Sequence, residues 1–246
     1  MSLAVKLVLS PLLVAQAVAT RSRMPRLPEA GGPRRGETGR GPLLRLLIAG
    51  DSSAAGVGVV SQQQALASQL AKRLAAAAGV RVRWQLQARS GLTSQQTLQL
   101  LRAEPPAHAD VAVVVTGVND VVDQIPSHRA VAAREALANW LRNAQAVQHV
   151  VFAPLPPVHR FPGLPQPLRW IAGADARRHD DALRAWAAAR SGDVSHVPIR
   201  YALDASAMAH DGFHPGPAVY RACGEAIACH LAAWLAAHPL PTENRP

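Results

Sequence analysis

The sequence predicts an α/β fold, a three-layer α/β/α sandwich around a mostly parallel, flavodoxin-like sheet of five strands. Short apolar runs alternate with segments of helical periodicity, as in proteins whose parallel strands are buried on both faces. This alternation implies right-handed βαβ units with helices on both sides of the sheet. The length of 246 residues suits one domain with a modest extension at one end.

Each predicted element follows from a local pattern. Residues 43–50, LLRLLIAG, form a continuous apolar run closed by glycine, as in a buried parallel strand, and residues 80–88 alternate between apolar and polar side chains. Good helix formers with helical spacing lie between the apolar runs. The predicted strands are 43–50, 80–88, 110–117, 149–155 and 194–199, and the predicted helices are 62–78, 93–102, 129–146, 174–190 and 216–237.

The chain before residue 43 has a different character. We expect a hydrophobic, basic N-terminal segment and strap over residues 1–42, a folded domain over 43–239 and a tail at 240–246. Within the first of these, residues 25–42 are rich in proline and glycine, which predicts a linker or an irregular strap across the surface.

An apolar stretch over residues 7–20 is followed at once by arginines at 21, 23 and 26. It is short for a membrane-spanning helix and suits the hydrophobic region of a signal peptide. The arginines would hold the domain on the cytoplasmic side, and an apolar helix with a basic edge can lie on an anionic membrane surface. We therefore expect residues 7–26 to contact the inner membrane peripherally. A helix packed on a cytoplasmic domain and an exported protein are the alternatives.

The formal charge of +10, from 26 basic and 16 acidic residues, raises the question of a nucleic-acid partner. Only Lys6 and Lys72 are lysines, and the arginines are scattered except for a cluster between residues 21 and 45 that contains no aromatic residue. This composition is more simply that of a GC-rich genome than of a groove that tracks phosphates, so we predict no nucleic-acid partner. No run of 18 apolar residues follows the N-terminus, which excludes a multi-span membrane protein.

Polar residues follow the predicted strands at their carboxyl ends, the edge where ligands bind in open parallel sheets. Ser52 follows the first strand, Gly91 the second and Asn119 the third. Asp211 and His214 stand between the last strand and the last helix. Each residue alone is equally well explained by turn or helix-cap chemistry. Together they supply a nucleophile, oxyanion donors and a base with its orienting carboxylate, which indicates a hydrolase.

These segments resemble the sequence blocks of the SGNH (GDSL-type) serine hydrolase family. The resemblance spans roughly residues 44–237, and Ser53 stands where the family usually has leucine. Residues 50–59, GDSSAAGVGV, resemble a bacterial esterase branch that also carries a short hydrophobic N-terminus. The matching blocks are Gly50-Asp51-Ser52, Gly91, Gly117-Val118-Asn119-Asp120 and Asp211-Gly212-Phe213-His214.

The resemblance implies a serine esterase that needs no metal and no organic cofactor. Ser52 would attack the ester carbonyl, His214 would take its proton, and Asp211 would orient His214. Asp211 and His214 are three residues apart, so their side chains meet only if the segment turns, which the intervening glycine favours.

The resemblance also implies an oxyanion hole made by the backbone N–H groups of Ser52 and Gly91 and by the side-chain amide of Asn119. Asp51 and Asp120 are expected to support these groups without touching the substrate.

Other classes fit less well. An α/β-hydrolase needs glycine at the position of Ala54, and a P-loop needs lysine at the position of Val57. A metal site could use His210 and His214, but a nearby glycine and proline oppose the helix that this spacing requires. A carbohydrate- or surface-binding pseudoenzyme is the alternative from another class. The complete set of active-site residue types argues against it.

Short loops after the strands predict a shallow site that favours short-acyl or aryl esters. Lysophospholipids, thioesters and O-acetylated glycans are the alternative substrates. The proline-rich loop at 154–170 would either form an apolar wall for the substrate or pack onto the body of the domain, through Phe161, Leu164, Leu168 and Trp170.

Overall fold

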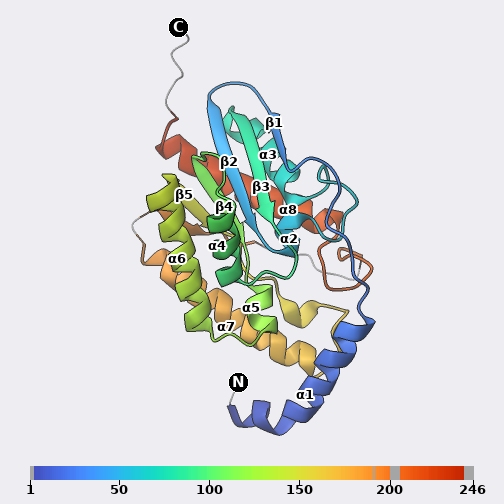
Figure 1. Ribbon diagram of the computed structural model, residues 1–246. Helices are drawn as coiled ribbons and strands as arrows, with labels where there is room; N and C mark the ends of the chain where they lie inside the picture. The colour runs from blue at the N-terminus through green and yellow to red at the C-terminus, as the bar shows by residue number, and fades with distance from the viewer. Residues whose placement is uncertain (1–2, 191, 200–205, 241–246) are drawn as a thin grey trace.

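The protein is described by a computed structural model that covers residues 3–190, 192–199 and 206–240. Within these residues a six-stranded sheet has the order β1-β3-β2-β4-β5-β6 (Figure 1). The five strands from β2 to β6 pair in parallel, in the flavodoxin-like order that the sequence predicts. The strands are β1 Arg35–Thr38, β2 Leu43–Gly50, β3 Arg81–Ala88, β4 Val111–Val115, β5 His149–Phe152 and β6 Val194–His196.

The expected number of five strands is wrong, because β1 adds a sixth at the edge of the sheet. It lies in the segment predicted as an irregular strap and pairs antiparallel with β3, from Arg35 opposite Gln85 to Thr38 opposite Val82. Its sequence, RGET, contains no apolar residue, so nothing in its pattern indicates a strand. Pairing with the free backbone edge of β3 decides its conformation.

The predicted helices are present with shifted ends. α3 begins four residues later than predicted, because residues 62–65 form turns. α7 begins six residues earlier, directly after Pro167. The helices are α1 Leu3–Arg23, α2 Ser52–Ala55, α3 Leu66–Ala78, α4 Ser94–Ala103, α5 Val118–Val122, α6 Ser127–Gln145, α7 Leu168–Ala188 and α8 Pro217–Ala237, with a 3-10 turn at Val158–Arg160.

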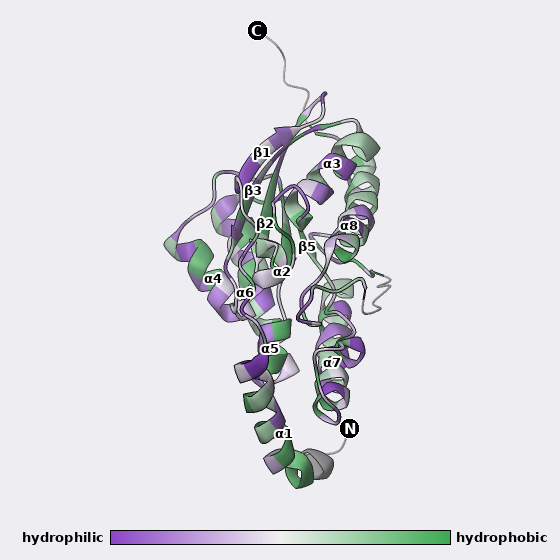
Figure 2. Ribbon diagram, turned by 90° about the vertical axis from the view of Figure 1, so that its right-hand side faces the viewer, coloured by the Kyte–Doolittle hydropathy of each residue, from purple (hydrophilic) through white to green (hydrophobic). Residues whose placement is uncertain are grey.

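Helices cover both faces of the sheet, which confirms the three-layer arrangement. On β2, Leu46 and Ile48 pack in the cluster that contains α3 and α8, whereas Leu47 and Ala49 pack in the cluster with α4, α6 and α7. Figure 2 shows α3 and α8 on one side of the strands and α4 and α6 on the other. Burying each such leucine stabilises the fold by roughly 1.5–3 kcal/mol, so the two clusters hold the strand ends in place.

The N-terminal helix α1 lies at the lower end of the molecule in Figure 1, beside the start of α7. The Gln16 side chain donates to the Gln166 carbonyl oxygen at 2.7 Å and accepts from the Leu168 backbone N–H at 3.1 Å. Leu7, Val8, Val14 and Val18 remain 62–79% exposed. Over residues 3–190, 192–199 and 206–240, no helix is both long and apolar enough to cross a membrane. Residues 241–246 of the expected tail lie outside the described residues.

Candidate active site

Ser52 is the first residue of α2, at the carboxyl end of β2. Gly50 ends the strand with φ +153°, where a Cβ atom would lie 2.0 Å from the Val115 carbonyl oxygen, so only glycine allows the chain to turn here. Asp51 caps α2 by accepting a hydrogen bond from the Ser53 backbone N–H at 2.9 Å. The Ser52 N–H belongs to the first turn, whose N–H groups have no partner within the helix, so it is positioned to donate to a ligand.

Asp51 is buried under the turn that carries Ser52. Its second carboxyl oxygen lies 3.5 Å from Asn119 Nδ2. Burial raises the pKa of Asp51 from 3.8 to about 7, because a charged carboxylate loses its hydration there, although the Ser53 N–H and the charge of His214 oppose this rise. The Asp51 carboxyl group therefore adds less negative charge beside the site than an exposed aspartate would.

Asp211 and His214 form a closed turn in which the carboxylate holds the imidazole. Asp211 Oδ1 accepts from the backbone N–H groups of Phe213 at 2.9 Å and His214 at 3.0 Å, and Oδ2 lies 2.6 Å from His214 Nδ1. Burial alone raises the pKa of Asp211, but these hydrogen bonds outweigh it and bring the pKa below its ordinary value. An ionised Asp211 requires a proton on His214 Nδ1, which leaves Nε2 as the acceptor.

Two contacts bring the His214 segment against the loop that follows Ser52. Gly58, with φ +100°, lies so close to the Pro215 carbonyl oxygen that a Cβ atom would be 2.3 Å away. The Tyr220 hydroxyl donates to the Val57 carbonyl oxygen at 2.7 Å. The charge of His214 reaches Asp51, the neighbour of Ser52, and lowers its pKa. The structure thus places the predicted base and the predicted nucleophile at the same edge of the sheet.

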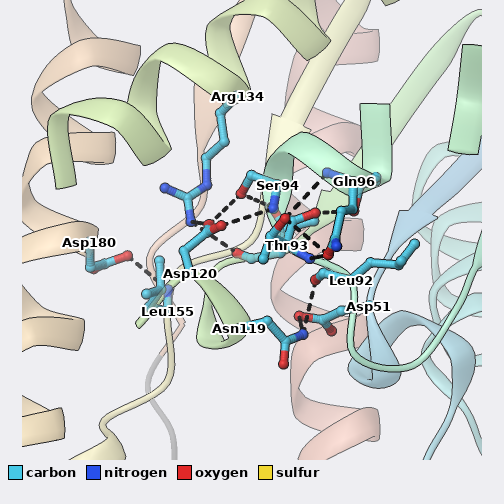
Figure 3. Close-up of polar contacts among 12 residues, drawn as sticks. Asp51, Leu92, Thr93, Ser94, Gln96, Asn119, Asp120, Arg134, Leu155 and Asp180 are labelled. Atoms are coloured by element: carbon cyan, nitrogen blue, oxygen red, sulfur yellow. Dashed lines mark hydrogen bonds and ion pairs between the residues drawn. The ribbon is translucent and has the colours of Figure 1, made fainter. Parts of the chain in front are cut away.

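Asn119 and Gly91 follow the ends of β4 and β3, the two strands that flank the strand before Ser52. Asn119 Nδ2 donates to the Leu92 carbonyl oxygen at 2.9 Å, which orients the amide beside Asp51 (Figure 3). Gly91 has φ +84°, and within the described part of the chain its backbone N–H has no hydrogen-bond partner. The amide and this N–H are the groups that the family resemblance implies as oxyanion donors, together with the Ser52 N–H.

Asp120 belongs to a buried polar network that the sequence did not indicate. It accepts hydrogen bonds from the backbone N–H of Ser94 at 3.0 Å and from its hydroxyl at 2.5 Å, and it forms an ion pair with Arg134 at 3.0 Å (Figure 3). Ser94, Arg134 and the Leu92 carbonyl are therefore functional candidates that the sequence analysis missed. The only sequence pattern that could have pointed to this network is the spacing of Thr93 and Gln96, which form a capping box at the start of α4, next to Ser94.

The proline-rich loop packs onto the body instead of lining the site. Phe161 and Leu164 are buried in the core cluster, and Leu168 packs against it. Gly163 donates to the Gly212 carbonyl oxygen at 3.0 Å, so the loop supports the Asp211–His214 turn from behind. Trp170 is 48% exposed.

No group of three or more His, Cys, Asp or Glu side chains that could hold a metal ion is found among the described residues. His210, which the sequence analysis considered beside His214 for a metal site and argued against, is exposed at the surface.

Comparison with known proteins identifies a family that this chain resembles over most of its length. Residues 48–222 match the GDSL-like lipase/acylhydrolase family. The chain is 29% identical over 232 residues to a GDSL-like esterase of Mycobacterium tuberculosis, a match that covers 85% of this chain and 72% of that protein.

Solved structures share the fold at low sequence identity. A lipase/acylhydrolase from Enterococcus faecalis superposes with a TM-score of 0.58 at 18% identity, over 82% of this chain and all of that chain. A carbohydrate esterase of family 3 from Clostridium thermocellum gives a TM-score of 0.59 at 17% identity, over 79% of this chain and 99% of that chain.

Proposed function

The chain belongs to the GDSL-like lipase/acylhydrolase family, and on that basis we propose that it is a serine esterase that hydrolyses short-acyl or aryl carboxylic esters through an acyl-enzyme. The observation that carries this proposal is the Asp211–His214 pair. Its 2.6 Å contact lies at the same edge of the sheet as Ser52, the first residue of a helix. A serine, a histidine and a carboxylate in this arrangement are what an acyl transfer requires.

In the first step, Ser52 Oγ attacks the carbonyl carbon of the ester and its proton passes to His214 Nε2. Asp211 accepts the hydrogen bond from Nδ1–H, which keeps Nε2 free to act as the base and stabilises the imidazolium that forms. The negative charge that develops on the carbonyl oxygen is met by the N–H groups of Ser52 and Gly91 and by the Asn119 amide.

In the second step, the tetrahedral intermediate collapses and the alcohol leaves with the proton that His214 donates. Water then attacks the acyl-enzyme, with His214 again accepting a proton, and Ser52 is regenerated as the acid departs. Phe213 packs beside the imidazole, with 5.2 Å between the ring centroids, and this contact supports the orientation of His214.

The test is a hydrolysis series over acyl-chain length and leaving group, with Ser52→Ala as the control. We expect the highest kcat/KM on acetyl to butyryl esters of good aryl leaving groups. Lysophospholipid, thioester and O-acetylated glycan substrates form separate arms, because a carbohydrate esterase shares the fold. Hydrolysis by the Ser52→Ala protein at the wild-type rate would exclude the proposed mechanism. Binding of a glycan without turnover of any ester would favour the pseudoenzyme.

The N-terminal helix α1 is proposed to lie on an anionic membrane surface and to bring the carboxyl edge of the sheet close to it. Its exposed valines and leucine supply the apolar face, and Arg21 and Arg23 in its last turn supply positive charge. Figure 1 shows α1 at the end of the molecule where α2 and α5 follow the strands. In the proposed division of the chain, the hydrolase domain spans residues 43–239. Two parts of the N-terminal segment pack against it: β1 pairs with β3, and Ala30 is buried in the core.

Vesicle sedimentation tests this contact. A protein with Val8, Val14 and Val18 changed to Gln should lose binding to vesicles that contain phosphatidylglycerol and keep its kcat on a soluble ester. Val60→Gln is the matched control, because Val60 is 86% exposed and lies outside α1. Equal binding by the triple variant and the wild type, or binding to phosphatidylcholine alone at the same level, would argue against the proposal.

A further inference from the structure

Arg134 is an arginine that the α6 helix carries into the interior, where its side chain is 0% exposed. Arginine is almost never fully buried without a partner. Its approach depends on Gly117, because a Cβ atom there would lie 2.4 Å from Arg134 Nη2. Only Nη2 has hydrogen-bond partners, whereas Nε and Nη1 have none among the described residues. Arg134 therefore acts mainly as a buried positive charge at one point.

That charge faces Asp120, whose side chain is 1% exposed. The carboxylate accepts one hydrogen bond from Arg134 and two from Ser94, the first residue of α4. A buried carboxylate without a positive partner would take up a proton or shift toward water. Arg134 thus supplies the positive partner of the Asp120 carboxylate, which holds the start of α4 through Ser94.

The start of α4 and the start of α5 are joined at two points. Asp120 binds Ser94, and its chain neighbour Asn119 donates to the Leu92 carbonyl oxygen at 2.9 Å (Figure 3). The turn that includes Gly91 and Leu92 therefore cannot move without moving the Asn119 amide. Both proposed oxyanion donors outside α2 depend on this double link.

We propose that Arg134 is a positioning residue for the oxyanion hole: by holding Asp120 against Ser94, it fixes the distance between the Asn119 amide and the Gly91 N–H. This inference rests on the proposed function. The charges of Asp120 and Arg134 both reach Asp51, next to the nucleophile, which agrees with a network close to the reacting atoms.

Kinetics of Arg134→Met and Arg134→Lys in the full chain test the proposal. Donors to an oxyanion act in the transition state, so Arg134→Met should lower kcat by about 10²-fold and change KM by less than about two-fold. Arg134→Lys restores a charge and one donor, so it should recover at least about ten-fold of that loss. Arg142→Met is the matched control, because Arg142 also lies on α6 and pairs with an aspartate, Asp193, away from the site. It should leave kcat unchanged.

A double-mutant cycle separates positioning from general destabilisation. If Arg134 acts through Asn119, the effect of Arg134→Met should disappear in the Asn119→Ala background, whereas independent effects multiply. If Arg134→Met does not fold, Arg134→Met with Asp120→Asn removes both charges and leaves no lone buried carboxylate. The same loss of kcat at unchanged KM is expected for that pair.

The following outcomes are decisive. A multiplicative cycle, or Arg134→Met with kcat within about three-fold of wild type, overturns this inference while Asn119→Ala still lowers kcat. A loss of kcat in Arg142→Met as large as that in Arg134→Met overturns it as well, since it indicates a shared structural effect. Wild-type kcat in Asn119→Ala overturns the inference too, because Asn119 is then no donor to be positioned, whereas wild-type kcat in Ser52→Ala overturns the proposed function on which the inference rests.

Discussion

A serine and a histidine lie at each of two opposite edges of the sheet. At the carboxyl edge, His214 directs Nδ1 at the Asp211 carboxylate, and Ser52 is the serine on which its Nε2 is proposed to act. At the amino edge, His149 directs Nδ1 at the Gly192 carbonyl oxygen at 3.1 Å, and its Nε2 lies 2.9 Å from the Ser195 hydroxyl. Since a carbonyl can only accept, His149 donates from Nδ1 and accepts from Ser195. Both histidines therefore have the same tautomer; Nε2 of His149 contacts Ser195, and Nε2 of His214 is proposed to act on Ser52.

The surroundings of the two imidazoles differ. His149 is buried and stacks on Trp234 at 4.8 Å, and burial, with the nearby His230, lowers its pKa from 6.5 to about 4. The nearby Asp193 carboxylate only partly offsets this lowering, and the partner of His149 Nδ1 is the Gly192 carbonyl and not a carboxylate. His214 is 17% exposed and has Asp211 as its partner. If the proposed function holds, the comparison teaches that a serine and a histidine become a catalytic pair where a carboxylate stabilises the imidazolium and N–H groups face the oxyanion.

Covalent labelling gives the largest contrast between the two edges. A fluorophosphonate should add to Ser52 and leave Ser195 unmodified, because the base proposed for Ser52 has a carboxylate partner, whereas burial lowers the pKa of His149 and disfavours its protonation by Ser195. Ser52→Ala should lower kcat by on the order of 10⁴ or more, and Ser195→Ala should leave it within about two-fold. Mass spectrometry of the labelled peptide decides the assignment, and label on Ser195, Ser53 or Ser90 would contradict it.

Replacing the two histidines should also lower kcat at the carboxyl edge and leave it unchanged at the amino edge. His214→Ala should be about as damaging as Ser52→Ala, since nucleophile and base act as a unit, and Asp211→Ala should be less damaging. His149→Phe should keep kcat, because its ring still stacks on Trp234. The measurement is kcat on a soluble ester, with circular dichroism as the control for folding. A larger loss in His210→Ala than in His214→Ala would show that the histidine is misassigned.

Loss of an oxyanion donor should give the next largest decrease in kcat. Asn119→Ala should lower kcat by about 10²–10³ with little change in KM, as the loss of one donor typically does. Asn119→Asp should be at least as poor, because it brings a negative charge to the developing oxyanion. Steady-state kinetics with a thermal melt checks this. Normal kcat with a lower melting temperature would mean that Asn119 only stabilises the Leu92 turn.

The sequence could predict the residues of this site better than the contacts between them. Ser52, Asn119 and the Asp211–His214 turn follow directly from strand ends and a three-residue spacing. The link from Arg134 to Asp120 and Ser94 could not be predicted, because these residues are separated along the chain and an arginine within a helix is ordinarily exposed. The carbonyl of Leu92 is a backbone group, so its role leaves no trace in residue type.

The fold shows the same limit. Continuous apolar runs made β2 and β4 predictable, because burial on both faces leaves a strong pattern. β1 carries no apolar residue and depends on the edge of β3. A strand whose own side chains are buried can be predicted from its sequence, whereas a strand that forms only by pairing with a neighbour's backbone cannot.

Asp51, at the carboxyl edge, should make the free energy of unfolding of the protein fall as pH rises. Its folded pKa of about 7 lies above its ordinary value of 3.8, so between these values the unfolded chain releases a proton that the folded protein keeps. Asp51→Asn keeps an acceptor for the Ser53 N–H and should abolish this loss, which is on the order of a few kcal/mol. Urea unfolding at pH 5 and pH 8 measures it. Equal pH dependence in the variant and the wild type would refute the assignment.

His149 should give the amino edge a smaller effect of opposite sign. Its pKa is lowered from 6.5 to about 4 on folding, so below pH 6.5 the unfolded chain binds a proton that the folded protein refuses. The stabilising contribution is present above pH 6.5 and is lost as pH falls toward 4. His149→Phe should lower stability at neutral pH, because the Gly192 carbonyl and the Ser195 hydroxyl lose their partner. It should also flatten the decline between pH 6.5 and 4. If the stability of the variant declines as steeply with falling pH as that of the wild type, His149 is not the group that titrates. His230, whose pKa is also lowered by burial, is then the next residue to replace.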